Sequence, residues 1–204
     1  IALGVVALTC SLSMVHDRGT GLLATICAIL LITRTGAAAF DTPLRSAAIY
    51  KQQIQMARLV HAFYDGASIA ANDIGAVNYY SDLKCVDLVG LADRRIFWAK
   101  RAAEYQTGTI ESETHSHGVK IAIVYDDWFS LHPSSSFGGP PLPPSWIRVG
   151  RWTIDARGRV GGDTVSFYAA DIREEGPLRA ALETYRKDLP AGVQVLPEPY
   201  PAEA

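Results

Sequence analysis

Polar and aromatic side chains gather where two short apolar segments of the chain end. The residues are Asn72, Asp73, Tyr79, Tyr80 and Asp87. Carboxylate and amide oxygens accept hydrogen bonds from adjacent hydroxyls, and a tyrosine ring offers an apolar face to a sugar ring. This pattern predicts a site that holds sugar hydroxyls. The alternative is that Asn72 and Asp73 only cap a helix and that Asp87 only fixes a turn.

A second candidate site follows the apolar segment 120–125, where Asp126, Asp127 and Trp128 occur in succession. At the end of a strand, Asp127 is suited to accept from sugar hydroxyls, and the Trp128 indole is suited to stack on a sugar ring. The alternative is a turn that contains a buried tryptophan, because large aromatic side chains mostly serve protein cores.

Four potential metal ligands alternate along the polar stretch 108–118. They are Glu111, Glu113, His115 and His117. On an extended chain all four point the same way, which is one layout for metal ligands. The stretch is polar and is predicted to be a loop, whereas metal sites are closed and held rigidly, so we expect no metal site. We expect no cofactor either, since the chain lacks a Walker-type phosphate loop and a dinucleotide fingerprint.

A predicted helix over residues 94–105 carries several basic side chains, namely Arg94, Arg95, Lys100 and Arg101. These cations suit anionic lipid head groups or the phosphate of a sugar donor. The alternative is an ordinary solvated helix face. The net charge of the whole chain is -2, which argues against a nucleic-acid partner, because such a partner requires a basic face.

The elements that must position these residues alternate between strands and helices. Small and β-branched residues predict strands at 68–71 and 84–87, with a short helix at 74–81 between them and a helix capped by Asp93 after them. The clearest core strand covers 120–125. Segments 146–154 and 164–168 predict a hairpin, and 177–189 a final helix. The fold class is therefore α/β with a mixed sheet, in which the early strands are parallel and the hairpin is antiparallel.

The N-terminal part of the chain is apolar over residues 1–15 and again over 21–39, with a polar turn at 16–20. A membrane helix needs about 20 apolar residues. We predict two transmembrane helices within residues 1–40. Asp41-Thr42-Pro43 then predicts the start of a new helix. Two alternatives stay open: a helical hairpin buried in a soluble core, and a secretory signal that ends near Ala39.

The sequence predicts three regions. Residues 1–40 form a transmembrane helical hairpin, 41–190 an extracytoplasmic α/β domain with a Pro/Ser/Gly-rich loop at 131–145, and 191–204 a loose tail. Arg18 places the loop between the two apolar helices in the cytoplasm, so residues after about 40 lie outside a bacterial inner (plasma) membrane. The first residue is Ile1, and we expect the chain to be a fragment of a longer protein.

A family resemblance rests on two signatures behind these apolar segments, Asn-Asp-Ile-Gly-Ala-Val-Asn-Tyr-Tyr at 72–80 and Val-Asp-Leu-Val-Gly-Leu-Ala-Asp at 86–93. With Val-Tyr-Asp-Asp-Trp-Phe at 124–129, they resemble the extracytoplasmic α/β domain that follows the last membrane helices in bacterial integral-membrane glycosyltransferases of the GT-C type. The resemblance covers about residues 39–129.

The resemblance implies a mannosyl- or arabinosyltransferase-like enzyme. Such an enzyme moves a sugar from a polyprenyl-phosphate donor to a cell-envelope glycan acceptor, in contact with membrane lipid. GT-C enzymes carry their acidic catalytic residue in the first extracytoplasmic loop, which this chain lacks. No catalytic residue is therefore assigned, and this domain is expected to support or shield an active site. The alternative function is a non-catalytic, membrane-anchored module that binds glycan.

Overall fold

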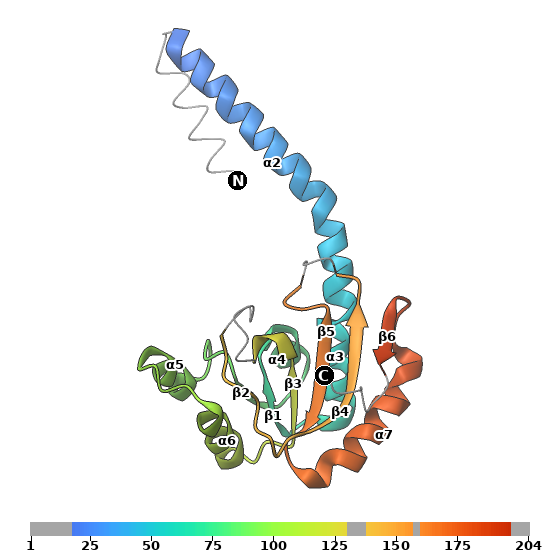
Figure 1. The fold of residues 1–204 in the computed structure, drawn as a ribbon. Coiled ribbons are helices and arrows are strands. Elements are labelled where there is room, and N and C mark those ends of the chain that lie inside the picture. The colour runs from blue at the N-terminus through green and yellow to red at the C-terminus, as the bar shows by residue number, and fades with distance from the viewer. Residues whose placement is uncertain (1–17, 130–137, 157–159, 197–204) are drawn as a thin grey trace, which may run out of the picture. The chain divides into compact units, whose positions relative to one another are not determined.

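The computed structural model describes residues 18–129, 138–156 and 160–196, with only the backbone for 18–24. The contacts divide the chain into two compact units, Ile1–Leu44 and Arg45–Ala204. The first predicted membrane helix, over residues 1–15, lies outside the described residues. The element order in the second unit is that of an α/β domain (Figure 1).

One long helix, α2, runs from Arg18–Lys51 and contains Pro43. The predicted helix start at Asp41 is therefore wrong, as is the predicted turn over residues 18–20. Proline removes one amide donor from a helix, but the residues on both sides of Pro43 are alanine-rich, and alanine is the best helix former. A helix of this composition continues through a single lost hydrogen bond.

Apolar side chains in the first unit are exposed. Four of them, Ile29, Leu30, Leu31 and Ile32, are open to solvent in the isolated chain. This exposure contradicts the alternative in which this segment is buried in a soluble core. Among the described residues, the helical stretch Thr25–Tyr64 holds an apolar window that is long enough to cross a membrane. The later part of this stretch, α3 (Gln53–Tyr64), packs into the domain core, so the candidate span lies within α2.

The described strands of the second unit form a six-stranded sheet in the order β2-β1-β3-β5-β4-β6. Strand β1 (Ser68–Ala71) pairs in parallel with β2 (Lys84–Asp87) and β3 (Ile121–Val124). Strand β5 (Thr164–Ala169) is antiparallel to β3 and to β4 (Ile147–Ile154). The predicted parallel strands and the predicted antiparallel hairpin are both confirmed.

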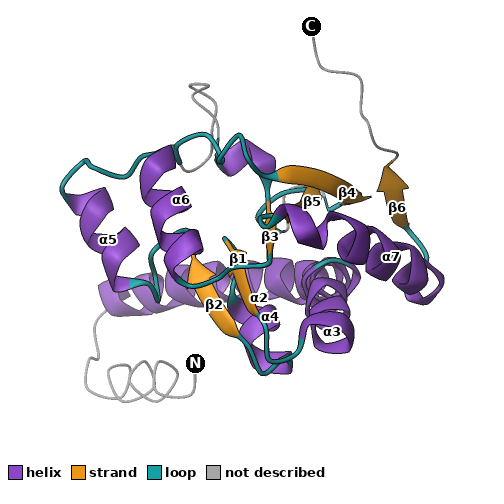
Figure 2. Ribbon diagram, turned by 90° about the horizontal axis from the view of Figure 1, so that it is seen from below, coloured by secondary structure: helices purple, strands orange, loops and turns teal. Residues whose placement is uncertain are grey.

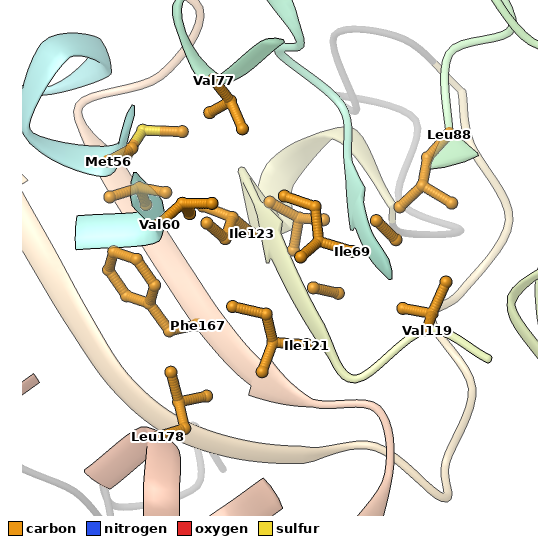
Figure 3. Packing of buried hydrophobic residues seen from close by; sticks show 14 of the residues in the cluster. Met56, Val60, Ile69, Val77, Leu88, Val119, Ile121, Ile123, Phe167 and Leu178 are labelled. Atoms are coloured by element: carbon orange, nitrogen blue, oxygen red, sulfur yellow. The ribbon is translucent and has the colours of Figure 1, made fainter. Parts of the chain in front are cut away.

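Helices cover both faces of the sheet. Figure 2 shows α3, α4 (Gly75–Tyr80) and α7 (Glu175–Tyr185) on one face, and α5 (Arg94–Arg101) and α6 (Thr107–Ser116) on the other. The crossover from β1 to β2 runs one way across the sheet, and the crossover from β2 to β3 runs the other way. Because crossovers between parallel strands are right-handed, their helices lie on opposite faces. Apolar side chains from α3, α4, α7 and the central strands meet in one core, where Met56, Ile123, Phe167 and Leu178 are fully buried (Figure 3).

Two segments differ from the expectation. The stretch predicted as a polar loop at 108–118 is largely α6, which begins with a capping box between Gln106 and Thr109. The start of the tail predicted to be loose is strand β6 (Val193–Leu196), which pairs antiparallel with β4. Residues 138–145 contain neither helix nor strand, as expected for the Pro-rich segment, while 130–137 and 197–204 lie outside the described residues.

Candidate functional site

The carboxyl ends of β1 and β3 form a switch point in the sheet. The chain leaves β1 toward β2 on one side, and the next crossover returns past β1 to β3 on its other side. Ligands of open α/β sheets bind in the crevice at such a point. Asn72 and Asp73 follow β1 here, and Tyr125, Asp126 and Asp127 follow β3. We call this set the carboxyl edge.

A buried hydrogen-bond network connects four parts of the domain at the carboxyl edge. The Tyr125 hydroxyl lies 2.9 Å from Gln52 Oε1 and 3.3 Å from Asp73 Oδ2, and it donates its one proton to either. Gln53 Nε2 donates to Asp73 Oδ2 at 2.6 Å, and Gln52 Nε2 donates to the Gly162 carbonyl at 2.9 Å. The network therefore fastens the chain that leaves α2 to β1, to β3 and to the turn of the β4–β5 hairpin.

The Tyr125 hydroxyl stays protonated in this network. Burial raises the pKa of Tyr125 far above its usual range, and the neighbouring Asp73 charge raises it further. A hydroxyl that keeps its proton remains a donor, so it is available to the Asp73 carboxylate whenever its proton is not directed to Gln52 Oε1. This arrangement allows a half-buried carboxylate to remain at the edge.

Asn72 holds the ends of β1 and β3 together. Its Oδ1 accepts from the Tyr125 amide at 3.2 Å, and its Nδ2 is buried with no partner among the described residues. Helix α4 is preceded by Ile74, and no side chain caps its amides. The capping role given as the alternative for Asn72 and Asp73 is therefore wrong, because their oxygens are engaged by β3 and α3 instead. Their roles in binding sugar stay predictions.

Asp87 fixes the turn after β2. Its two oxygens accept from the Val89 amide at 2.9 Å and the Ala92 amide at 2.7 Å, and the residue is almost fully buried. This is the turn-forming role given as the alternative. The predicted cap at Asp93 is confirmed, since its carboxylate accepts from the Arg95 and Ile96 amides at the start of α5.

The two adjacent aspartates after β3 have different surroundings. Asp126 accepts from Ser166 at 2.6 Å, from Tyr168 at 2.8 Å and from Arg148 at 3.3 Å. Asp127 is exposed. The protein still covers part of its carboxylate, and this partial loss of water raises the pKa of Asp127. The nearby charges of Asp126 and Asp163 raise the pKa further. Asp126 thus holds β4 and β5 to the turn after β3. Asp127 is the carboxylate of this pair that solvent or a ligand can reach.

Trp128 is buried beside this turn. Its Nε1 donates to the Gly161 carbonyl at 2.9 Å, and its ring packs on Tyr125 with 5.5 Å between the ring centres. That is the environment of a buried turn tryptophan, the alternative given for this residue. In contrast, α4 presents Tyr79 and Tyr80 outward, with Tyr79 80 % exposed and the two rings edge to face at 4.9 Å.

The four alternating Glu and His residues do not point the same way, because most of the stretch is helical. Glu113 is buried in α6. Its Oε2 lies 3.0 Å from Arg95 Nη1, and its Oε1 lies 3.3 Å from His117 Nδ1. No group of three or more potential metal ligands occurs within the described ranges. Glu113 instead ties α6 to α5.

The basic side chains of α5 are partly engaged within the domain. Arg95 pairs with Glu113, and Lys100 Nζ donates to the Val89 carbonyl at 2.9 Å. Burial lowers the pKa of Lys100. Arg101 lies over the exposed rings of Phe97 and Trp98. The predicted contact of this helix with anionic lipid stays a prediction.

Sequence reasoning missed three groups that bond to the carboxyl edge or belong to it, namely Gln52, Gln53 and Tyr125. Tyr125 could have been found, since it is the last residue of the clearest predicted core strand. Nothing in the sequence marks the two glutamines, because their partners lie 73 and 20 residues away along the chain.

A family model for a domain of unknown function, DUF8728, matches residues 46–168. The chain belongs to the DUF8728 family. The matched DUF8728 region contains the whole carboxyl edge and all the strands from β1 to β5 except the last residue of β5. No curated protein and no solved structure matches the chain.

Proposed function

We propose that this chain is the C-terminal part of a bacterial membrane glycosyltransferase that uses a polyprenyl-phosphate sugar and a cell-envelope glycan acceptor. The observation that carries the proposal is that the carboxyl edge is bonded to the residue that directly follows α2, the helix that contains the candidate span. Gln52 follows the last residue of α2 and is bonded at once to Tyr125 and to the hairpin turn. The resemblance of residues 39–129 to GT-C extracytoplasmic domains supports the same proposal.

The domain supports or shields the active site and does not supply its catalytic acid or base. A general base must reach the proton that it removes. Asp73 and Asp126 direct oxygens to donors of their own chain, and Asp87 is buried in its turn. Asp127 is the accessible carboxylate of the carboxyl edge, and we assign it to substrate contact together with Tyr79 and Tyr80.

This proposal places α2 in the bacterial plasma membrane and the DUF8728 domain outside it, in contact with lipid and glycan. The support is the exposed apolar surface of α2, which water does not favour and lipid does. The second unit buries a main hydrophobic core of its own, as expected for a body in water.

The test is a transfer assay with the full-length gene product in isolated membranes. Radiolabelled polyprenyl-phosphate mannose and polyprenyl-phosphate arabinose are supplied in turn, and label is followed into envelope glycan. We expect transfer from one of the two donors. We also expect Gln52→Ala, which removes the link to Tyr125, to lower the rate at unchanged protein level. No transfer from either donor, with the protein present and folded, would contradict the proposal.

A second function, a membrane-anchored module that binds glycan without catalysis, is favoured by the exposed Tyr79 and Tyr80 rings on α4. Aromatic faces at the surface are suited to stacking on sugar rings. The two functions differ in one result. The module predicts retention of the wild-type protein on immobilised envelope glycan, loss of retention in Tyr79→Ala, and no transfer of label by either protein.

A further inference from the structure

Two adjoining cavities lie at the opposite edge of the sheet, where β3 begins. The larger has a volume of about 1000 Å³ and lies between α6, the start of β4 and the segment after β5. The smaller has a volume of about 320 Å³ and lies between the end of α3 and α7. Both are lined by Lys120 and Glu174, so we treat them as one cleft, the amino-edge cleft. Their sizes are in the range of small-molecule sites.

The charges of the amino-edge cleft disfavour an anionic ligand. Lys120 Nζ lies 3.3 Å from Glu174 Oε1, and Arg173 forms a two-pronged ion pair with Asp171. Both cations are therefore already paired with carboxylates inside the cleft. Glu111 and Asp65 add two further carboxylates to its walls. A phosphate or nucleotide would meet more negative than positive charge here, whereas a neutral ligand would not be repelled.

The same groups are suited to hydroxyls. An ammonium group donates three hydrogen bonds and a carboxylate accepts several, so a Lys–Glu pair can bond two neighbouring hydroxyls of one ligand. Apolar surface lies beside these polar groups. The ring of Trp146 is buried against Tyr168 with 6.1 Å between centres, which fixes it in the wall, and Phe63 is half exposed beside the smaller cavity.

The Tyr64 hydroxyl lies near Glu174 in the wall of the smaller cavity. Tyr64 is 5 % exposed and lines the smaller cavity, and its hydroxyl has no hydrogen-bond partner among the described residues. A buried polar group without a partner destabilises the fold, so such groups are rare unless something else satisfies them. Burial raises the pKa of Tyr64, and the charge of the nearby Glu174 carboxylate and its weak interaction with the hydroxyl raise it further. The hydroxyl therefore stays neutral and able to donate, and it lacks a well-formed hydrogen bond within the chain.

We propose that the amino-edge cleft binds a neutral saccharide, with one sugar hydroxyl on Tyr64 and neighbouring hydroxyls on Glu174 and Lys120. The larger cavity then holds a further sugar unit beside Trp146. This site is separate from the carboxyl edge and does not depend on the transfer reaction. If the chain binds saccharide here but transfers no sugar, this inference holds and the proposed function fails.

The test uses the full chain in detergent, titrated with a mannobiose, an arabinobiose and inorganic phosphate, with binding followed by saturation-transfer difference NMR and calorimetry. We expect one of the disaccharides to bind and phosphate not to bind. Tyr64→Phe removes only the hydroxyl and keeps the ring, and we expect at least tenfold weaker binding with a melting temperature that is not lowered. A structural role for the hydroxyl would instead lower the melting temperature.

Glu174→Gln is the second variant, because it keeps the shape of the side chain and removes its charge. We expect it to weaken binding as well. Glu183→Gln, on the exposed side of α7 and away from the cleft, is the matched control and should bind like the wild type. The proposal is overturned if neither disaccharide binds, if phosphate binds instead, or if both Tyr64→Phe and Glu174→Gln bind as the wild type does.

Discussion

Asp126 and Asp127 are neighbours in the chain, yet Asp126 holds neighbouring strands together while Asp127 is exposed. The Asp126 carboxylate accepts from two hydroxyls and a guanidinium that belong to β4 and β5. Partial burial, together with the charges of Asp126 and Asp163, instead raises the pKa of Asp127. Adjacent positions thus have different roles: Asp126 holds strands of the sheet together, and Asp127 is accessible to a ligand.

We predict that Asp126→Asn lowers the free energy of unfolding by about 1.5–3 kcal/mol, the range for hydrogen bonds that involve a charged group. The amide keeps one acceptor oxygen but turns an NH2 group toward donors. Chemical denaturation measures the change. Asp127→Asn is the matched control, with the same chemistry at the next position, and should not destabilise the protein. Equal losses in the two variants would contradict the distinction.

The raised pKa of Asp127 gives a pH dependence with a definite sign. Its usual value is 3.8, and folding raises it, so the folded protein binds this proton more tightly than the unfolded chain does. The resulting stability is present at low pH and is lost as the pH rises from about 3.8 through the raised pKa. Asp127→Asn lacks this contribution.

The measurement is the melting temperature of the wild type minus that of Asp127→Asn, followed upward from pH 4. We expect this difference to fall with rising pH and then become constant once Asp127 is ionised in the folded protein. A difference that rises with pH would mean that folding lowers the pKa.

At the scale of elements, the turn of the β4–β5 hairpin packs on the aromatic side chains that follow β3. A Cβ at Gly161 would lie 2.8 Å from the Tyr125 ring and 2.9 Å from the Trp128 ring. We predict that Gly161→Ala destabilises the domain by about 1–3 kcal/mol, because both rings are fixed in place and overpacking costs this much.

Gly176→Ala is the control for that substitution. Gly176 lies in α7, and a Cβ there meets nothing within 4 Å. Gly176 precedes Pro177, which disfavours a helical backbone at a residue with a Cβ and offsets the better helix propensity of alanine. This variant should therefore be about as stable as the wild type. If Gly161→Ala were equally harmless in chemical denaturation, the turn would not pack on these rings as described.

The sequence predicted those elements whose pattern is strong by itself. Strands β1, β2 and β3 are short runs of small or β-branched residues, and the Asp93 cap marks the start of α5. Helix α6 was missed because Thr107–Ser116 shows little apolar periodicity, so that only its capping box and its contacts hold it. Strand β6 was missed because four residues between prolines carry too little signal, and it exists through its pairing with β4.

For the candidate site, the sequence identified the positions but not the partners. Asn72, Asp73 and Asp127 do lie at the carboxyl edge, since residues that follow parallel strands must. Asn72 accepts from the Tyr125 amide, and the donors beside Asp73 are Gln53 and the Tyr125 hydroxyl. Tertiary packing decides which of these side chains meet. The capping role for Asn72 failed for that reason, because the Tyr125 amide competes for the same oxygen.

At the scale of the whole molecule, the chain joins an apolar helix to an α/β domain. The described part of α2 exposes large apolar side chains along its length, while the second unit, Arg45–Ala204, buries its own core. The proposed function requires lipid around the first unit and water around the second, on the outer side of the plasma membrane.

The most direct test of that requirement is the labelling of Tyr79→Cys in intact cells with a membrane-impermeant maleimide, against wild-type protein as the background for the native cysteines. Tyr79 is 80 % exposed, so the new thiol is reachable from whichever side the domain occupies. We predict labelling in intact cells, with no gain after permeabilisation. Labelling that occurs only after permeabilisation would place the domain in the cytoplasm and contradict the account.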